Sequence, residues 1–226
     1  MKLKIENLKL ITCMPKEYKI LAAVAIGAVI LGVVLFKFTS TPITHAPLTD
    51  RGGVYSLGNP EAPVKVTEFA DFQCPACRQA NDFSTQLLAA YPNQIQFIFR
   101  HFPLTNHPHA LISAQAAEAA GAQGKFWEMH DLLYEKQDEW GDLTNLLPRE
   151  RVFELFKGYA RGLGLDEGAF SKAVETNAFA GTIDQDMSAA TASGVNSTPS
   201  FFVNGQLINE PSYQAIKNAV DKALNK

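Results

Sequence analysis

The feature that most constrains this chain is the segment 64–78, VKVTEFADFQCPACR, where an apolar strand pattern ends directly in a Cys-Pro-Ala-Cys turn. The β-branched and aromatic side chains of Val64, Val66 and Phe69 predict a buried strand. Pro75 suits the first position of a helix, where its missing N–H group would have no partner anyway. The segment therefore predicts a strand followed at once by a helix that begins at the first cysteine.

This placement has a chemical consequence for the two cysteines. We expect Cys74 at the N-cap, where free backbone N–H groups and the positive end of the helix dipole favour an anion. For a cysteine the anion is the thiolate, which is the reactive form. Cys77 follows one turn later and is expected on the same side of the helix, with Pro75 and Ala76 forming the turn between the two thiols.

A second landmark is the uncharged run 20–36, ILAAVAIGAVILGVVLF. When it is extended through Phe38, with Lys37 snorkelling, its helical length approaches the ~30 Å hydrocarbon thickness of a bilayer. We therefore expect a transmembrane helix over 20–38. Five lysines and two glutamates precede the run, so the positive-inside rule places residues 1–19 in the cytoplasm and the rest of the chain outside, with the helix acting as a signal anchor.

The alternative is a signal peptide that is removed after export. The small-residue sites THA and TST are each followed by proline, at Pro47 and Pro42, which disfavours cleavage. Cys13 precedes the apolar run, so it is not placed as a lipid-bearing cysteine, and we expect it to be a reduced cytosolic thiol.

Composition changes after the apolar run. Residues 39–53 are rich in threonine and proline and are expected to form an extended linker, and the folded domain is expected over 54–226, about 170 residues, enough for one core. Residues 1–40 hold six lysines and two glutamates of the chain's 20 basic and 23 acidic residues, which leaves 14 basic and 21 acidic residues in the exported part. This acidic balance argues against nucleic acid or an anionic lipid surface as a partner.

Periodicity beyond the turn predicts further elements in a definite order. The first helix continues to Tyr91, and a second strand over 95–100 then implies a parallel pair with a right-handed crossover. A helical block follows over about 106–192, and Asn204-Gly205 is a strong two-residue hairpin signal. The remaining expected elements are helices over 109–122, 125–136, 149–162, 170–193 and 213–224, and strands over 200–203 and 206–208.

This order, with the CPAC turn after the first strand and Thr198-Pro199 before the hairpin, resembles the DsbA-like branch of the thioredoxin superfamily, specifically its membrane-anchored bacterial members. The resemblance covers about residues 54–226. It implies an α/β, thioredoxin-like fold with an inserted helical domain over about 106–192, preceded here by one N-terminal transmembrane helix.

The resemblance also implies roles for residues around the cysteines. Pro199, preceded by Thr198, matches the family's cis-proline beside the disulfide, where a substrate strand docks; an ordinary trans proline is the alternative. Glu68 matches an acidic residue beneath the active site that relays a proton to Cys77; a solvent-facing strand glutamate is the alternative. Arg78 is either a support for the thiolate or a solvated arginine on the helix face, and the second is favoured.

Function follows from the paired cysteines, which outside the cytoplasm pair with each other or with a substrate. We expect a thiol–disulfide oxidoreductase that forms disulfides in exported cysteine-containing proteins and needs no cofactor or metal. The family resemblance further implies that a quinone-linked membrane partner re-oxidises it. A reductase or isomerase of the same fold is the alternative in the enzyme class. Outside that class, the motif also allows a purely structural disulfide, or a tethered chaperone or metal carrier, for example with copper held by Cys74, Cys77 and His101.

Overall fold

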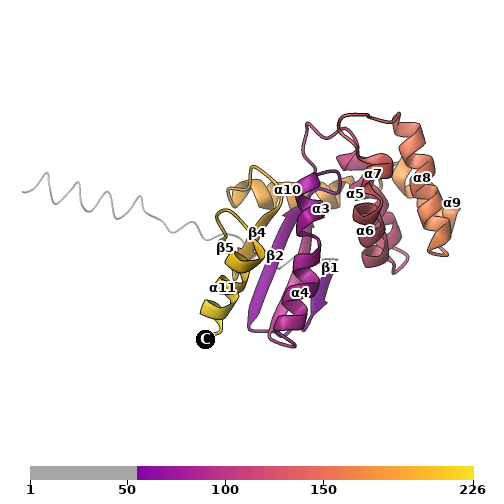
Figure 1. Ribbon diagram of the computed structural model, residues 1–226. Helices are drawn as coiled ribbons and strands as arrows, with labels where there is room; N and C mark the ends of the chain where they lie inside the picture. The colour runs from indigo at the N-terminus through magenta and orange to yellow at the C-terminus, as the bar shows by residue number, and fades with distance from the viewer. Residues whose placement is uncertain (1–54) are drawn as a thin grey trace, which may run out of the picture. The chain divides into compact units, whose positions relative to one another are not determined.

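A five-stranded mixed sheet organises the residues that the computed structural model describes, 55–226 (Figure 1). Its strand order is β1-β3-β2-β4-β5. Central strand β2 runs parallel to β3, with Val66 opposite Phe97, and antiparallel to β4, with Val66 opposite Val203. The strands are β1 (Tyr55–Gly58), β2 (Val64–Ala70), β3 (Ile95–His101), β4 (Ser200–Val203) and β5 (Gln206–Leu207).

The crossover from β2 to β3 consists of two helices, α3 (Pro75–Ala80) and α4 (Asp82–Ala90). The prediction of a single helix that continues to Tyr91 is therefore wrong at Asn81. At Asn81 the backbone N–H group bonds to the carbonyl of Arg78, three residues back, which interrupts the α-helical ladder. This break leaves α3 as a short, separate helix, with Cys74 immediately before it and Cys77 in its first turn.

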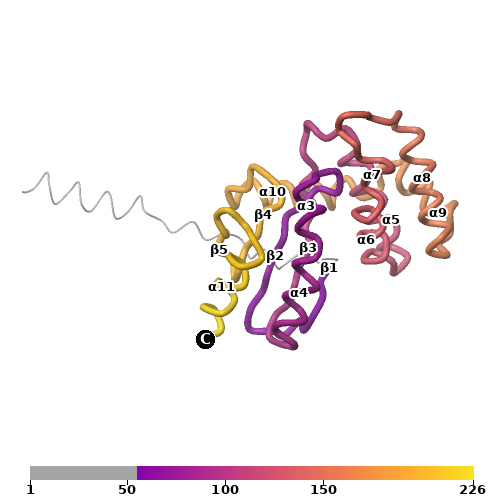
Figure 2. The backbone as a smooth tube through the Cα atoms, in the orientation of Figure 1, coloured from indigo at the N-terminus to yellow at the C-terminus, as the bar shows by residue number. Residues whose placement is uncertain are grey.

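The chain between β3 and β4 holds six helices among the described residues. In Figure 1 and in the backbone trace of Figure 2, α5 to α9 gather beside the sheet, and α10 leads back to β4. The helices are α5 (Ala110–Gly121), α6 (Phe126–Glu135), α7 (Gln137–Trp140), α8 (Arg149–Gly162), α9 (Glu167–Glu175) and α10 (Ala180–Ala192).

Two differences from the sequence predictions have local causes. The helix predicted over 170–193 is two helices, because Asn177 adopts a left-handed conformation with φ of 50° and ends α9. Strand β1 was not predicted, since four residues are too short a pattern to stand out from the preceding linker; it is held by antiparallel pairing with β3. The hairpin is confirmed, with left-handed Asn204 and Gly205 between β4 and β5.

The sheet separates apolar clusters on its two faces. On one face Val64 and Val66 pack with Leu87 of α4 and with Ile216 of α11 (Tyr213–Ala223). On the other face Phe69 of β2 packs with Phe202 and with Ala190 of α10. Because both faces are covered, β2 is buried along most of its length, which explains its continuous apolar pattern. Full burial of each such side chain contributes about 1.5–3 kcal/mol.

None of the helices in residues 55–226 combines the length and the apolar composition that a membrane crossing requires. The predicted cytoplasmic segment 1–19, the transmembrane helix 20–38 and the linker 39–53 all lie outside the described residues.

Candidate active site

The two cysteines lie where strand β2 passes into helix α3. Cys74 is the N-cap of α3, with an extended backbone (φ −73°, ψ 122°), and Pro75 occupies the first turn. The Cys74 N–H group donates to the Asp71 carbonyl, 3.0 Å away, which closes the turn between strand and helix. Both thiols are free, and Cys74 is 6% exposed whereas Cys77 is completely buried. Of the two sulfur atoms, Cys74 is therefore the one that a partner molecule can approach.

The surroundings of Cys74 stabilise its thiolate and lower its pKa to about 5. The main cause is the Cys77 thiol, which donates a hydrogen bond to the Cys74 sulfur, and burial acts in the opposite direction. The backbone N–H groups of Ala76 and Cys77 lower the pKa further. These backbone donors are the unpaired groups of the first helical turn, so the predicted N-cap location of Cys74 accounts for part of the effect.

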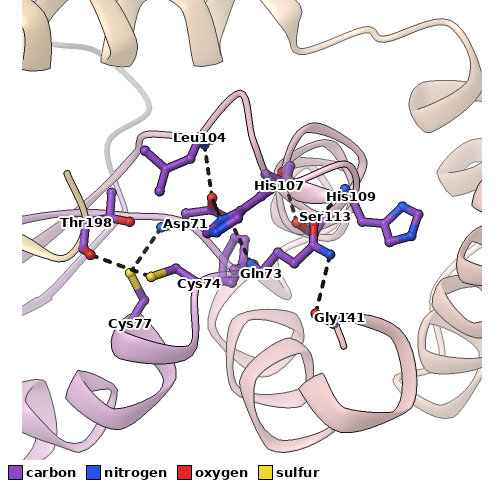
Figure 3. Close-up of polar contacts among 12 residues, drawn as sticks. Asp71, Gln73, Cys74, Cys77, Leu104, His107, His109, Ser113, Gly141 and Thr198 are labelled. Carbon is purple, nitrogen blue, oxygen red and sulfur yellow. Dashed lines mark hydrogen bonds and ion pairs between the residues drawn. The ribbon is translucent and has the colours of Figure 1, made fainter. Parts of the chain in front are cut away.

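Cys77 has the opposite character. Burial raises its pKa well above the ordinary value, and the hydrogen bond to Cys74 and the charges of Cys74 and Glu68 raise it further. Its sulfur accepts a hydrogen bond from the Asp71 N–H group at 3.5 Å (Figure 3). The reduced site therefore pairs an ionised outer thiol with a protonated inner one.

Thr198 and Pro199 lie beside Cys74, 124 residues away in sequence. The peptide bond between them is cis, as expected. In its protonated form, Cys74 donates a hydrogen bond from its thiol to the Thr198 carbonyl, 3.5 Å away (Figure 3). The Thr198 hydroxyl is buried and has no hydrogen-bond partner among the described residues. The residue before the proline thus presents a carbonyl and a free hydroxyl next to the reactive sulfur.

Glu68 lies on β2, on the same face as Val66, and is buried rather than solvent-facing. Burial raises the pKa of its carboxyl to about 8. Its charge also acts on Cys77, which places the carboxyl near the inner thiol. A group with this pKa exchanges its proton near neutral pH, as a proton relay to Cys77 requires.

Arg78 and His101, which the sequence offered as possible partners of the cysteines, bond to other side chains. Arg78 pairs with Asp138 at the surface. His101 bonds through Nε2 to Glu118 at 3.1 Å, and within residues 55–226 no three or more histidine, cysteine or acidic side chains are grouped as metal ligands. The copper alternative, with His101 beside the two cysteines, therefore has no counterpart in the described geometry.

Several polar residues that hold the turn before Cys74 in place were not predicted. The Asp71 carboxylate accepts hydrogen bonds from the backbone of Gln73 (2.7 Å) and Leu104 (3.0 Å) and from His107 Nδ1 (2.6 Å). Gln137 of α7 donates to the Cys74 carbonyl at 3.1 Å. The one available signal was Asp71 itself, a charged residue at the end of a buried strand; its partners lie too far along the chain for local patterns to reveal.

A redox-capable cysteine pair at the start of a helix that follows a central parallel strand defines the class of thiol–disulfide oxidoreductases. The family described as thioredoxin matches residues 50–222 of this chain. The chain belongs to this family, and its folded part is a thioredoxin-like domain with the site of a thiol–disulfide oxidoreductase.

Solved structures show the same fold. A thioredoxin-like oxidoreductase from Silicibacter pomeroyi is 30% identical, with a TM-score of 0.63, and the match covers 80% of this chain and 97% of that one. BdbD from Bacillus subtilis, in its oxidised form, is 24% identical with a TM-score of 0.67, and the match covers 77% of this chain and 94% of that one.

The curated relatives are longer proteins. A protein named Na(+)/H(+) antiporter NhaA 3, from Salinispora tropica, is 44% identical over 169 residues, which are 74% of this chain and 24% of the relative. The chain thus spans about a quarter of the length of that relative. The antiporter name belongs to the whole of that relative, and the region that it shares with this chain is about a quarter of its length.

Proposed function

We propose that this chain oxidises cysteine pairs in exported proteins by giving up a disulfide between Cys74 and Cys77. The observation that carries the proposal is the asymmetry of the two thiols: the Cys74 pKa is lowered to about 5, whereas that of Cys77 is raised. A stabilised thiolate stabilises the reduced form, and a disulfide whose reduced form is stable is an oxidant.

The exchange proceeds in two balanced steps. A substrate thiolate attacks the Cys74 sulfur, a substrate–Cys74 bond forms, and Cys77 leaves with the electron pair and takes up a proton. A second substrate thiolate then attacks the substrate sulfur of this mixed disulfide and releases Cys74 as a thiolate. The substrate dithiol is thereby oxidised to a disulfide, and the protein disulfide is reduced to Cys74 and Cys77.

Neighbouring groups have distinct tasks in these steps. Cys74 is the better leaving group of the second step because its thiolate is stabilised. Glu68, whose pKa is raised to about 8, supplies the proton that Cys77 needs when it leaves. The Thr198 carbonyl, next to the Cys74 sulfur, accepts a backbone N–H group of the substrate, and the cis-bonded Pro199 keeps this edge free of a competing donor.

We extend the proposal to the location of the protein and to its partners, which depend in part on residues outside the described range. The lysine-flanked apolar run 20–38 serves as a single membrane anchor, and the catalytic domain lies on the extracytoplasmic side. Each turnover leaves the pair reduced, so a membrane partner that passes electrons to quinone restores the disulfide. The acidic balance of the domain fits protein substrates rather than nucleic acid.

The test uses the oxidised full-length chain and a reduced, unfolded protein that contains two cysteines. We expect the substrate to lose its free thiols at a rate that requires Cys74, so that Cys74→Ser abolishes the reaction. Cys77→Ala is expected to accumulate as a mixed disulfide when it is expressed in cells, because the inner thiol that releases trapped complexes is missing. A folded and exported Cys77→Ala protein without reductant-sensitive adducts on a non-reducing gel would contradict the mechanism.

A further inference from the structure

The turn before Cys74 contains a buried carboxylate, that of Asp71, which is hydrogen-bonded to His107. The proposed mechanism uses neither residue. Every polar group of Asp71 has a partner: its carbonyl accepts from the Cys74 N–H group, its N–H group donates to the Cys77 sulfur, and its carboxylate takes three hydrogen bonds. The side chain of Asp71 is completely buried and that of His107 is 6% exposed. In the view of Figure 3, the pair lies to the right of the two sulfur atoms, on the side away from Thr198.

The histidine comes from a different part of the chain from the cysteines. His107 belongs to the loop between β3 and α5, and its N–H group bonds to the Leu104 carbonyl. The Leu104 N–H group and His107 Nδ1 both bond to the same Asp71 oxygen, at 3.0 and 2.6 Å. Both ends of this small turn are therefore fixed on one carboxylate, which sets the position of the imidazole relative to the cysteines.

Negative charge is concentrated around this position. The Asp71 carboxylate lies 2.6 Å from His107 Nδ1, and the Asp71 backbone bonds to both cysteines, through its carbonyl to the Cys74 N–H group and through its N–H group to the Cys77 sulfur. When Cys74 ionises, its thiolate joins the Asp71 carboxylate in this region. A protonated His107 compensates one of the two negative charges, whereas a neutral His107 leaves both in place.

We propose that His107, held by Asp71, is the positioning residue and counter-charge that stabilises the Cys74 thiolate and so makes the disulfide more oxidising below the pKa of His107. This deepens the proposed function, on which it rests, because it makes the oxidising strength of the pair depend on pH. The titratable groups that act on His107 are Asp71, from the turn after β2, and Cys74, at the start of α3. The hydrogen bond to Asp71 raises the pKa of His107, burial lowers it, and the charges of Asp71 and Cys74 raise it.

The first test compares the reduced full-length chain with His107→Asn, in which an amide replaces Nδ1 as donor to Asp71 but carries no charge. Titration of the thiolate by ultraviolet absorbance is expected to give a Cys74 pKa that is higher by about one in the variant, a roughly tenfold loss of thiolate stability. At pH values above the raised pKa of His107, the wild-type and variant redox equilibria with glutathione should converge, since neither protein then carries the charge.

His109→Gln is the matched control. His109 lies in the same loop and is also buried, and its pKa is lowered, mainly by burial, so that between the two pKa values His109 is neutral while His107 is charged. Glutamine keeps a donor near Nε2, which bonds to the Leu147 carbonyl. This control is expected to leave the Cys74 pKa unchanged, which separates loss of charge from loss of a loop histidine.

A second measurement needs no substitution. Because coupling between two sites is reciprocal, the His107 pKa, followed by NMR, should be lower in the disulfide form than in the reduced form by about the amount that His107 lowers the pKa of Cys74. Equal His107 pKa values in the two redox forms, or superimposable thiolate titrations of wild type and His107→Asn, would overturn the inference and leave the proposed function intact. A wild-type Cys74 that titrates like free cysteine would instead remove the proposed function itself.

Discussion

At the scale of single residues, surroundings give identical side chains opposite chemistry. Cys74 and Cys77 are three positions apart, yet the pKa of the first is lowered and that of the second raised. The two loop histidines also differ, since the pKa of His107 is raised and that of His109 is lowered. The N-cap effect on Cys74 was predictable because it depends on adjacent residues. The Asp71–His107 pair was not, since its members are 36 residues apart and meet only after β2 and β3 align.

Glu68 offers a test at this scale. Its pKa rises from 4.5 to about 8 on burial, so between these values the folded protein holds a proton that the unfolded chain has released. The free energy of unfolding therefore contains a contribution that is complete below pH 4.5 and is lost as pH rises towards 8. We expect Glu68→Gln to gain stability relative to wild type across this window, by about 3 to 5 kcal/mol between its ends.

Chemical denaturation of both reduced proteins at several pH values measures this difference. Glu150→Gln, an exposed glutamate at the start of α8, is the control and should follow the wild-type curve. A Glu68→Gln protein whose stability parallels that of wild type from pH 4.5 to 8 would show that the Glu68 carboxyl is ionised in the folded state.

At the scale of elements, the predictions were right where neighbouring residues define the element. They were wrong where a helix breaks inside a continuous helical pattern. The strand β2 with its cysteine turn, and the hairpin at Asn204-Gly205, were predicted because turn residues and apolar bulk lie next to each other. The breaks at Asn81 and Asn177 were missed, since an asparagine inside a helical pattern reads as an ordinary polar position until its backbone bonds are known.

The cap of α9 tests how the helical block is stabilised. The Asp166 side chain accepts from the Ala169 N–H group at 2.9 Å at the start of this helix. We expect Asp166→Ala to lower the free energy of unfolding by about 1 kcal/mol, because a helix donor loses its partner. Asp184→Ala, at an exposed site within α10, lacks this role and should leave the free energy of unfolding unchanged or raise it by up to about 0.7 kcal/mol, because alanine favours a helix more than aspartate does. Thermal denaturation compares them; equal effects of the two changes would contradict the capping argument.

At the scale of the whole molecule, the sheet brings three distant segments to one point. Parallel pairing of β2 with β3 aligns the turn before Cys74 with the loop that carries His107, and antiparallel pairing with β4 brings Thr198 to the same edge. The order of elements, together with the CPAC turn and Thr198-Pro199, carried the family resemblance that predicted a thioredoxin-like fold with a helical insertion. The polar network beneath the cysteines depends on the register between strands, which no local pattern encodes.

The equilibrium of the Cys74–Cys77 pair with glutathione tests the central claim most directly. A thiolate pKa of about 5 lies between those of thioredoxin (about 7) and DsbA (about 3.5), so the reduction potential of the full-length chain should fall between about −270 and −120 mV. The measurement is the fraction of reduced protein across defined ratios of reduced to oxidised glutathione. A potential within that interval and well above the thioredoxin value supports the proposed disulfide donor. A potential at or below about −270 mV would contradict it and assign the pair to a reductase.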